Sequence, residues 1–222
     1  MDKRFSYGEA IKYGFKILNL NFVFLATVYL IAVIISFIPH IANKYFLRDS
    51  PLLAAILIIG GSLLILMINL DLIKIAIKFC DGEKGTYNDL LSSSNLLLKY
   101  IAAKILYALI VIGGTILLII PGIIWAIKYS FYTYLIVDKG LGPVEALKKS
   151  SEITKGARWN LFVFGIVMIA LNIAGLICFG IGILVTLPVT QIAVAFVLRK
   201  LQSSHKSIEP QTEEVPTLVT ER

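Results

Sequence analysis

Two charged residues lie among apolar ones, and they are the candidates for chemistry in this chain. Lys128 precedes Asp138 by ten residues inside one apolar segment, and Asp71 precedes Asp81 by ten at the end of another. Ten helical residues rise about 15 Å, so two helices running in the same direction would place both charges at one depth. A lone charge at the bilayer centre costs from about 3 to more than 10 kcal/mol, so a partner is expected. The sequence therefore predicts an ion pair between Asp71 and Lys128.

The same residues also allow a second interpretation. Asp71, Lys74 and Lys78 are spaced by three and four residues, which would place them on one face of a helix that continues into the cytoplasm. Lys128 would then extend its amine toward the membrane surface among neighbouring tyrosines. In this interpretation neither residue is functional, whereas a buried pair fits either packing or a small-solute transporter or channel.

Other residues suited to catalysis or metal binding are few. The histidines are His40 and His205, and the cysteines are Cys80 and Cys178. No HExxH, paired-cysteine, Walker or dinucleotide-binding glycine motif occurs. The acids cluster at expected helix starts and in the C-terminal segment, where capping and solvation account for them. We therefore expect no enzyme activity, no catalytic or metal-binding residue and no cofactor.

The elements that must position these residues are apolar segments of transmembrane length. Of the 222 residues, 58% are hydrophobic and 16% are charged, against roughly 45–50% and 25% in soluble proteins. Because a span takes about 20 residues, six helices fit this length. We predict an all-α, polytopic membrane bundle with spans at residues 22–38, 52–70, 102–120, 123–137, 161–178 and 183–198. The fourth and sixth segments are short for a span, and the alternative is that two joined short helices form a re-entrant hairpin. Polar residues inside the spans are expected to form hydrogen bonds between helices, and these are Asn69, Asn172, Thr186, Thr190 and Gln191.

The distribution of Lys and Arg predicts the orientation. If the spans alternate in direction, Lys44 and Arg48 lie on one side, Lys128 lies in a span, and the other 18 of 21 lie on the opposite side. Basic residues favour the cytoplasm, so both termini are predicted to be cytoplasmic. The net charge of +7 is then attributed to anchoring on an anionic leaflet. Membrane lipids, and alternatively another membrane protein, are the expected partners, and nucleic acid is not.

A helix-start pattern recurs three times along the chain. It is a capping residue followed three positions later by an acid, and the copies are Ser6-x-x-Glu9, Thr86-x-x-Asp89 and Gly142-x-x-Glu145. Such an acid favours a helix N-terminus, and the first copy has the form of a capping box. We predict three hairpins, each preceded by a cytoplasmic amphipathic helix. The alternative is that the three matches are unrelated helix starts.

The C-terminal segment differs in composition from the rest. Residues 202–222 are polar, contain Pro210 and Pro216, and show no periodic apolar face. Such a segment cannot bury enough apolar surface to fold. We expect an integral membrane domain over residues 1–201 and a disordered cytoplasmic tail over 202–222.

One stretch resembles a known family. Residues 121–162 contain Pro121-Gly122, Lys128, Asp138, Gly142-Pro143, Glu145-Ala146, Ser150, Gly156 and Trp159. In these features the stretch is similar to a bacterial family of six-helix membrane proteins that includes the membrane portion of some glycerophosphoryl diester phosphodiesterases. The resemblance implies a multi-pass module of the bacterial inner (cell) membrane. The catalytic domain of those enzymes has no counterpart here, so no catalytic residue is carried over. We expect a non-enzymatic module that interacts with lipids or another membrane protein.

Overall fold

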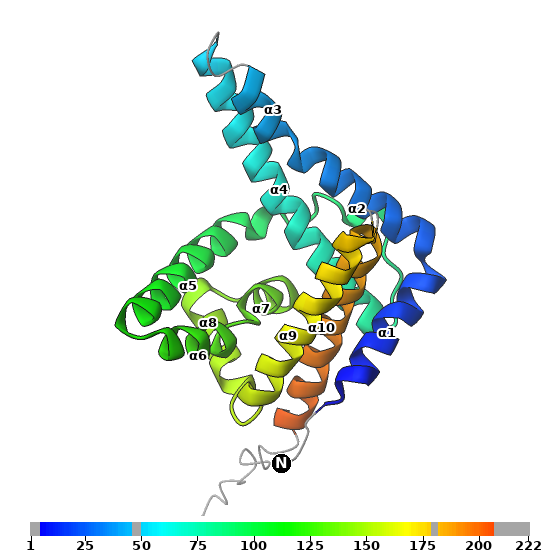
Figure 1. Ribbon diagram of the computed structural model, residues 1–222, viewed down its shortest axis with the longest axis vertical. Helices are drawn as coiled ribbons and strands as arrows, with labels where there is room; N and C mark the ends of the chain where they lie inside the picture. Colours follow the sequence, from blue (N-terminus) through cyan, green and yellow to red (C-terminus); the bar gives the residue numbers. More distant parts are fainter. Residues whose placement is uncertain (1–4, 46–49, 179–181, 207–222) are drawn as a thin grey trace, which may run out of the picture.

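The computed structural model describes residues 5–45, 50–178 and 182–206, and these are mostly helical, with no strand among them (Figure 1). The elements are α1 (Tyr7–Leu20), α2 (Phe22–Ser36), α3 (Ile38–Tyr45), α4 (Pro51–Cys80), η1 (Tyr87–Asp89), η2 (Ser94–Leu96), α5 (Leu97–Leu117), α6 (Ile119–Lys128), α7 (Tyr132–Lys139), α8 (Pro143–Ile153), α9 (Arg158–Ile177) and α10 (Ile183–Lys206), where η denotes a 3₁₀ turn.

Six helical segments are long and apolar enough to cross a membrane. They are Phe22–Tyr45, Pro51–Cys80, Tyr87–Leu117, Ile119–Lys139, Arg158–Ile177 and Ile183–His205, with a mean hydropathy between 1.3 and 2.6. This confirms the prediction of an all-α chain with six candidate spans. Such a pattern is typical of a multi-pass membrane protein.

Two helices extend beyond the predicted span ends. Helix α4 continues ten residues past residue 70 and ends at Cys80. The polar side chains of this extension, Asp71, Lys74 and Lys78, bind residues 89–93 of the segment that follows the helix. Helix α10 continues to Lys206, so the predicted boundary between residues 201 and 202 falls inside a helix. Residues 207–222 of the predicted tail lie outside the described residues.

The fourth span is broken, which the sequence did not predict. The predicted continuous segment 123–137 is divided into α6 and α7, with a turn at residues 129–131. Pro121 does not end the preceding span but lies in the first turn of α6, which begins at Ile119. Proline is tolerated there because the first N–H groups of a helix have no partner within the helix.

The arrangement of the helices is shown in Figure 1. Helix α3 packs on α4, α5 on α6, and α9 on α10, and α10 also contacts α1 and α4. The α3/α4 and α5/α6 ends project from the centre in different directions, and α7 lies between α4, α5 and α8 (Figure 1). The buried core follows α4, α7 and α10. The arrangement of these pairs as three transmembrane hairpins stays a prediction.

The three predicted helix starts differ in the structure. Gly142 precedes α8 with Pro143 at its start, and Glu9 lies in the first turn of α1. The capping box forms at Thr86 and Asp89, but it opens a single 3₁₀ turn rather than the predicted second helix. The sequence interpretation of Ser6 as a capping-box residue was wrong, because its side chain makes no capping hydrogen bond.

Three of the polar residues predicted to join helices form hydrogen bonds between α10 and another helix. Asn172 of α9 donates to Thr190 Oγ1 of α10 over 2.9 Å, and Tyr29 of α2 donates to Gln191 Oε1 of α10 over 2.7 Å. Asn69 instead donates to the Ile65 carbonyl of its own helix. Thr186 Oγ1 is buried and has no hydrogen-bond partner among the described residues. The expected hydrogen bonds between helices therefore form for Asn172, Thr190 and Gln191, and not for Asn69 or Thr186.

Candidate functional site

The carboxylate of Asp71 lies fully buried on α4 and is held by backbone N–H groups. Leu91 N donates to Asp71 Oδ2 over 2.6 Å, and Ser93 N donates to Oδ1 over 3.0 Å. The hydroxyl of Ser92 lies 3.4 Å from Oδ1. Hydrogen bonds of this kind, from N–H groups to a charged acceptor, are among the strong ones. They fix the segment between the two 3₁₀ turns onto α4.

Two lysines on the same face of α4 hold this segment as well. Lys74 Nζ lies 2.9 Å from Ser92 Oγ, and Lys78 Nζ lies 2.5 Å from Asp89 Oδ1. Residues 71, 74 and 78 therefore all face the segment that follows α4, as the second interpretation of the sequence requires. This face of α4 stabilises the segment between the two 3₁₀ turns. The segment lies at the end of α4 that is predicted to be cytoplasmic.

The predicted pair of Asp71 and Lys128 does not form, and this prediction is corrected. Within the described part of the chain, Lys128 makes no ion pair, and its amine lies 4.9 Å from the ring centroid of Tyr129. The reason is that Asp71 is already satisfied by backbone donors about twenty residues further along the chain. Every residue except proline has a backbone N–H group, so the spacing of charged residues could not predict that such groups would bind Asp71.

Lys128 is nevertheless at a special position, because it is the last residue of α6 at the break in the fourth span. Its carbonyl accepts hydrogen bonds from Ser150 Oγ and Thr154 Oγ1, each over 3.1 Å. Phe131 N, on the other side of the break, donates to Ser150 Oγ over 3.1 Å. Ser150 lies on α8 and Thr154 directly follows its last residue, and both are fully buried. Helix α8 thus supplies the partners that the broken helix lacks, as broken membrane helices require.

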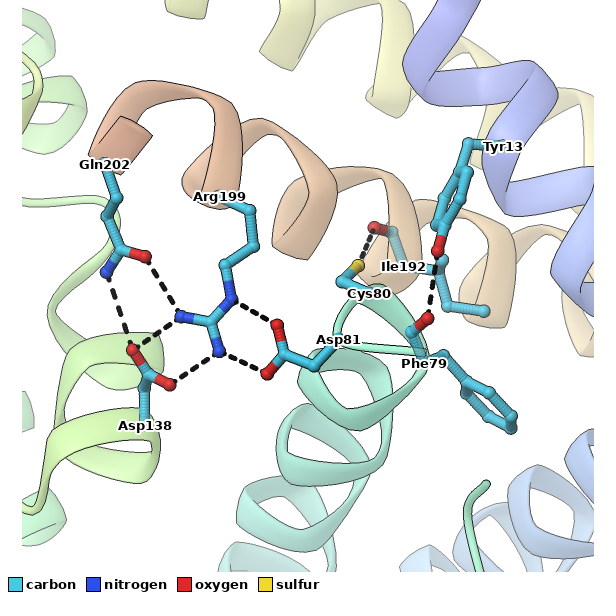
Figure 2. Close-up of polar contacts among 8 residues, drawn as sticks. All are labelled: Tyr13, Phe79, Cys80, Asp81, Asp138, Ile192, Arg199 and Gln202. Carbon is cyan, nitrogen blue, oxygen red and sulfur yellow. Dashed lines mark hydrogen bonds and ion pairs between the residues drawn. The ribbon is translucent and has the colours of Figure 1, made fainter. Parts of the chain in front are cut away.

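A third polar cluster joins the ends of three spans, and Figure 2 shows it. Arg199 of α10 donates from Nε and Nη2 to Asp81 over 2.8 and 2.5 Å, and from Nη1 and Nη2 to Asp138 over 2.8 Å each (Figure 2). Asp81 follows α4 and Asp138 lies at the end of α7. Gln202 accepts from Nη1 over 3.0 Å. We call Arg199, Asp81, Asp138 and Gln202 the arginine junction.

The neighbouring residues tie further helices to the arginine junction. Tyr13 of α1 donates to the Phe79 carbonyl over 2.9 Å, and Cys80 Sγ lies 3.7 Å from the Ile192 carbonyl of α10 (Figure 2). Burial, and then the nearby Cys80 and Asp81, raise the pKa of Tyr13 above its ordinary value. The hydroxyl therefore stays protonated and able to donate.

Chemically, the arginine junction is a closed ion cluster. A guanidinium group matches carboxylates in a planar, two-pronged geometry, and here it is engaged by two carboxylates at once. The arrangement holds helix ends together. Among the described residues, no group of three His, Cys, Asp or Glu could hold a metal ion.

The sequence does not predict the arginine junction, because Arg199 enters the sequence prediction only as one of the basic residues that indicate orientation. One signal was present: Asp81 precedes Gly82 directly and Asp138 precedes Gly140 by two residues, and both glycines have positive φ, 81° and 63°. Glycine in this conformation commonly ends helices. Asp81 and Asp138 therefore lie at equivalent ends of the second and fourth spans. Arg199, a basic residue at the end of the sixth span, could bind both.

Comparison with known proteins gives relatives without a known activity. An uncharacterised protein of Mycobacterium bovis is 28% identical over 140 residues, which are 62% of this chain and 42% of that protein. Uncharacterised proteins of Mycobacterium tuberculosis are 28% and 27% identical over the same length. The chain therefore matches less than half the length of these relatives. No solved structure matches.

None of these matches links the chain to glycerophosphoryl diester phosphodiesterase, so that resemblance stays a prediction. The family model described as "Protein of unknown function (DUF975)" matches residues 86–205. This range begins at the capping box of Thr86 and includes the broken fourth span, α8 and Arg199. Because the match covers more than half of its 222 residues, the chain belongs to the DUF975 family.

Proposed function

We propose that this protein is a non-enzymatic, multi-pass module of the bacterial inner membrane that interacts with lipids or with another membrane protein. The observation that carries the proposal is the outward-facing apolar surface of the spans. In the apolar window of Tyr87–Leu117 only 11% of residues are buried, and in that of Pro51–Cys80 only 17%. Soluble monomers rarely expose apolar surface on this scale. Lipid tails would cover it.

The position of the charged residues supports a cytoplasmic face at the arginine junction. Lys200 forms an ion pair with Glu9 over 3.1 Å, so α1 meets the end of α10 near Arg199. Lys12 and Lys16 on α1 are exposed. Each Lys or Arg near an anionic leaflet contributes about 1 kcal/mol of attraction. We propose that this face contacts the inner leaflet and that both termini are cytoplasmic.

We propose further that the protein has no catalytic or nucleic-acid-binding activity. The support is that the four described aspartates, Asp71, Asp81, Asp89 and Asp138, each accept hydrogen bonds from protein donors. The resemblance of residues 121–162 to the phosphodiesterase membrane portion is proposed as kinship of a membrane module alone. A transporter or channel built on Asp71 and Lys128 is not favoured, because the two residues are engaged separately.

The proposal predicts that the thermal stability of the protein depends on the charge of the surrounding lipids. The full chain would be placed in nanodiscs of phosphatidylcholine and in nanodiscs that also contain phosphatidylglycerol, and Tm would be measured by tryptophan fluorescence. A higher Tm in the anionic discs that disappears in high salt supports the proposal, because salt screens surface charges. Equal melting in both discs would contradict it.

A further inference from the structure

An apolar groove runs between α6 and α9, which lie side by side (Figure 1). Its hollow of about 450 Å³ is lined by one charged residue, Arg158, and six apolar ones, namely Ile120, Ile123, Ile124, Ile127, Trp159 and Phe162. A second hollow of about 360 Å³ shares Ile123, Ile127 and Phe162 with the first and continues toward Val194 of α10. The two hollows together form one elongated groove that is apolar apart from Arg158 in the first hollow and Ser130 in the second.

Arg158, at one end of this groove, has a hydrogen-bond donor without a partner. Its Nε is buried and has no hydrogen-bond partner among the described residues, and its guanidinium forms no ion pair with any of them. This contrasts with Arg199, which is held by two carboxylates. A buried donor of this kind calls for an acceptor beyond the described residues. Since the guanidinium is cationic and planar, a phosphate or carboxylate fits it best.

The neighbouring aromatic residue indicates the depth of Arg158. Trp159 is 62% exposed at the start of α9, and tryptophan in membrane proteins concentrates at the headgroup level. Arg158 would then lie where lipid phosphates are the prevailing anions. The first turn of α9 adds positive partial charge, because no side chain caps it.

We propose that the groove between α6 and α9 binds a glycerophospholipid, with its phosphate on Arg158 and one acyl chain along the isoleucines and Phe162. The inference rests on the proposed function as a membrane module, which it deepens by naming a site and a ligand class. The ligand must combine an anion with a long apolar chain, because the groove presents one cation and an apolar floor.

The test uses the full chain in detergent micelles with phosphatidylglycerol as the probe, and bound lipid is counted by native mass spectrometry. We expect Arg158→Gln to lower the retained lipid at least tenfold and Arg158→Lys to lower it less. Ile124→Trp, which fills the groove and keeps the charge, should also lower retention. The matched control is Lys84→Gln, which removes an exposed loop cation and should leave retention unchanged.

Two results would overturn the site. One is equal retention by the wild type and Arg158→Gln, and the other is equal retention of palmitate, which has a carboxylate and no phosphate. Melting of Arg158→Gln in neutral and anionic nanodiscs separates this proposal from the broader one. If that variant keeps the Tm shift and also keeps its lipid, the site is wrong and the leaflet interaction stands. If the Tm of the wild type is the same in neutral and anionic nanodiscs, the proposed interaction with an anionic leaflet is wrong, whatever the result for lipid retention.

Discussion

The backbone N–H of Leu91 donates a 2.6 Å hydrogen bond to the buried carboxylate of Asp71. Leu91 has a positive φ of 66°, a region that a leucine rarely adopts. Its side chain is 49% exposed, so burial of the side chain does not explain the conformation. Asp71 offers the explanation, because it accepts from both Leu91 N and Ser93 N and thereby holds the backbone of the segment after α4.

Replacing Asp71 should therefore destabilise the protein far more than replacing Lys128. We expect Asp71→Asn to lower the free energy of unfolding by about 1.5–3 kcal/mol, because an amide cannot accept from both N–H groups as a carboxylate does. Lys128→Met should cost no more than about 1 kcal/mol, the size of a cation–π contact. Unfolding in SDS measures both. Rescue by the charge-swapped double variant Asp71→Lys/Lys128→Asp would restore the ion-pair hypothesis.

The break in the fourth span should depend on the hydroxyl groups of Ser150 and Thr154. Ser150→Ala combined with Thr154→Val leaves the Lys128 carbonyl and Phe131 N without these partners. Each unsatisfied buried group costs about 1–3 kcal/mol, so a clear fall in Tm is expected. Ser151→Ala is the matched control, because its hydroxyl makes no hydrogen bond with the described residues. Similar melting of the two variants would mean that the break does not need α8.

Replacing the guanidinium group of Arg199 should destabilise the contact between the ends of three spans. Arg199→Lys keeps the charge but cannot bind two carboxylates in a planar fashion. Arg199→Met leaves Asp81 and Asp138 facing each other without a cation. We expect Tm to fall in the order wild type, Lys, Met, with about 1–3 kcal/mol lost in the last, since the cluster is partly exposed. Restored stability in the triple variant Arg199→Met/Asp81→Asn/Asp138→Asn would confirm charge repulsion as the cause.

The close approach of α9 and α10 should tolerate no side chain at Gly175. A Cβ there would lie 2.5 Å from Thr186 Oγ1 and 3.0 Å from the Gly182 carbonyl oxygen. Gly175→Ala should thus cost about 1–3 kcal/mol through overpacking. Gly165, ten residues earlier on the same helix, has open space, so Gly165→Ala should be neutral or stabilising by up to about 1 kcal/mol. Thermal melting of the two variants compares them directly, and equal effects would contradict the helix contact.

The proposed orientation can be tested with the native cysteines. Cys178 is exposed and follows α9, whereas Cys80 is half-buried near the arginine junction. If the termini are cytoplasmic, a membrane-impermeant maleimide should label Cys178 in intact spheroplasts. Cys178→Ser should abolish this labelling. Labelling of Cys178 only in inverted vesicles would reverse the orientation.

The helical class and the six candidate spans could be predicted from the amino-acid sequence alone. Their formation depends on local composition, since about 20 apolar residues suffice for a span whatever lies elsewhere in the chain. The Gly142-Pro143 start of α8 is equally local, because Pro143 is preset for a first helical turn. The capping box of Thr86 and Asp89 could also be recognised from spacing alone.

Which polar groups meet depends on how distant helices pack and could not be predicted from the sequence. Arg199 lies 118 residues from Asp81 and 61 from Asp138, and no periodicity relates such distances. The Asp71 carboxylate and the Lys128 carbonyl found partners in backbone N–H groups and in hydroxyls of α8, which carry no net charge and leave no charge pattern. Inside a low-dielectric environment, buried polar groups take the donors that packing brings within reach. Packing of distant helices, rather than the spacing of charges, therefore determined these partners.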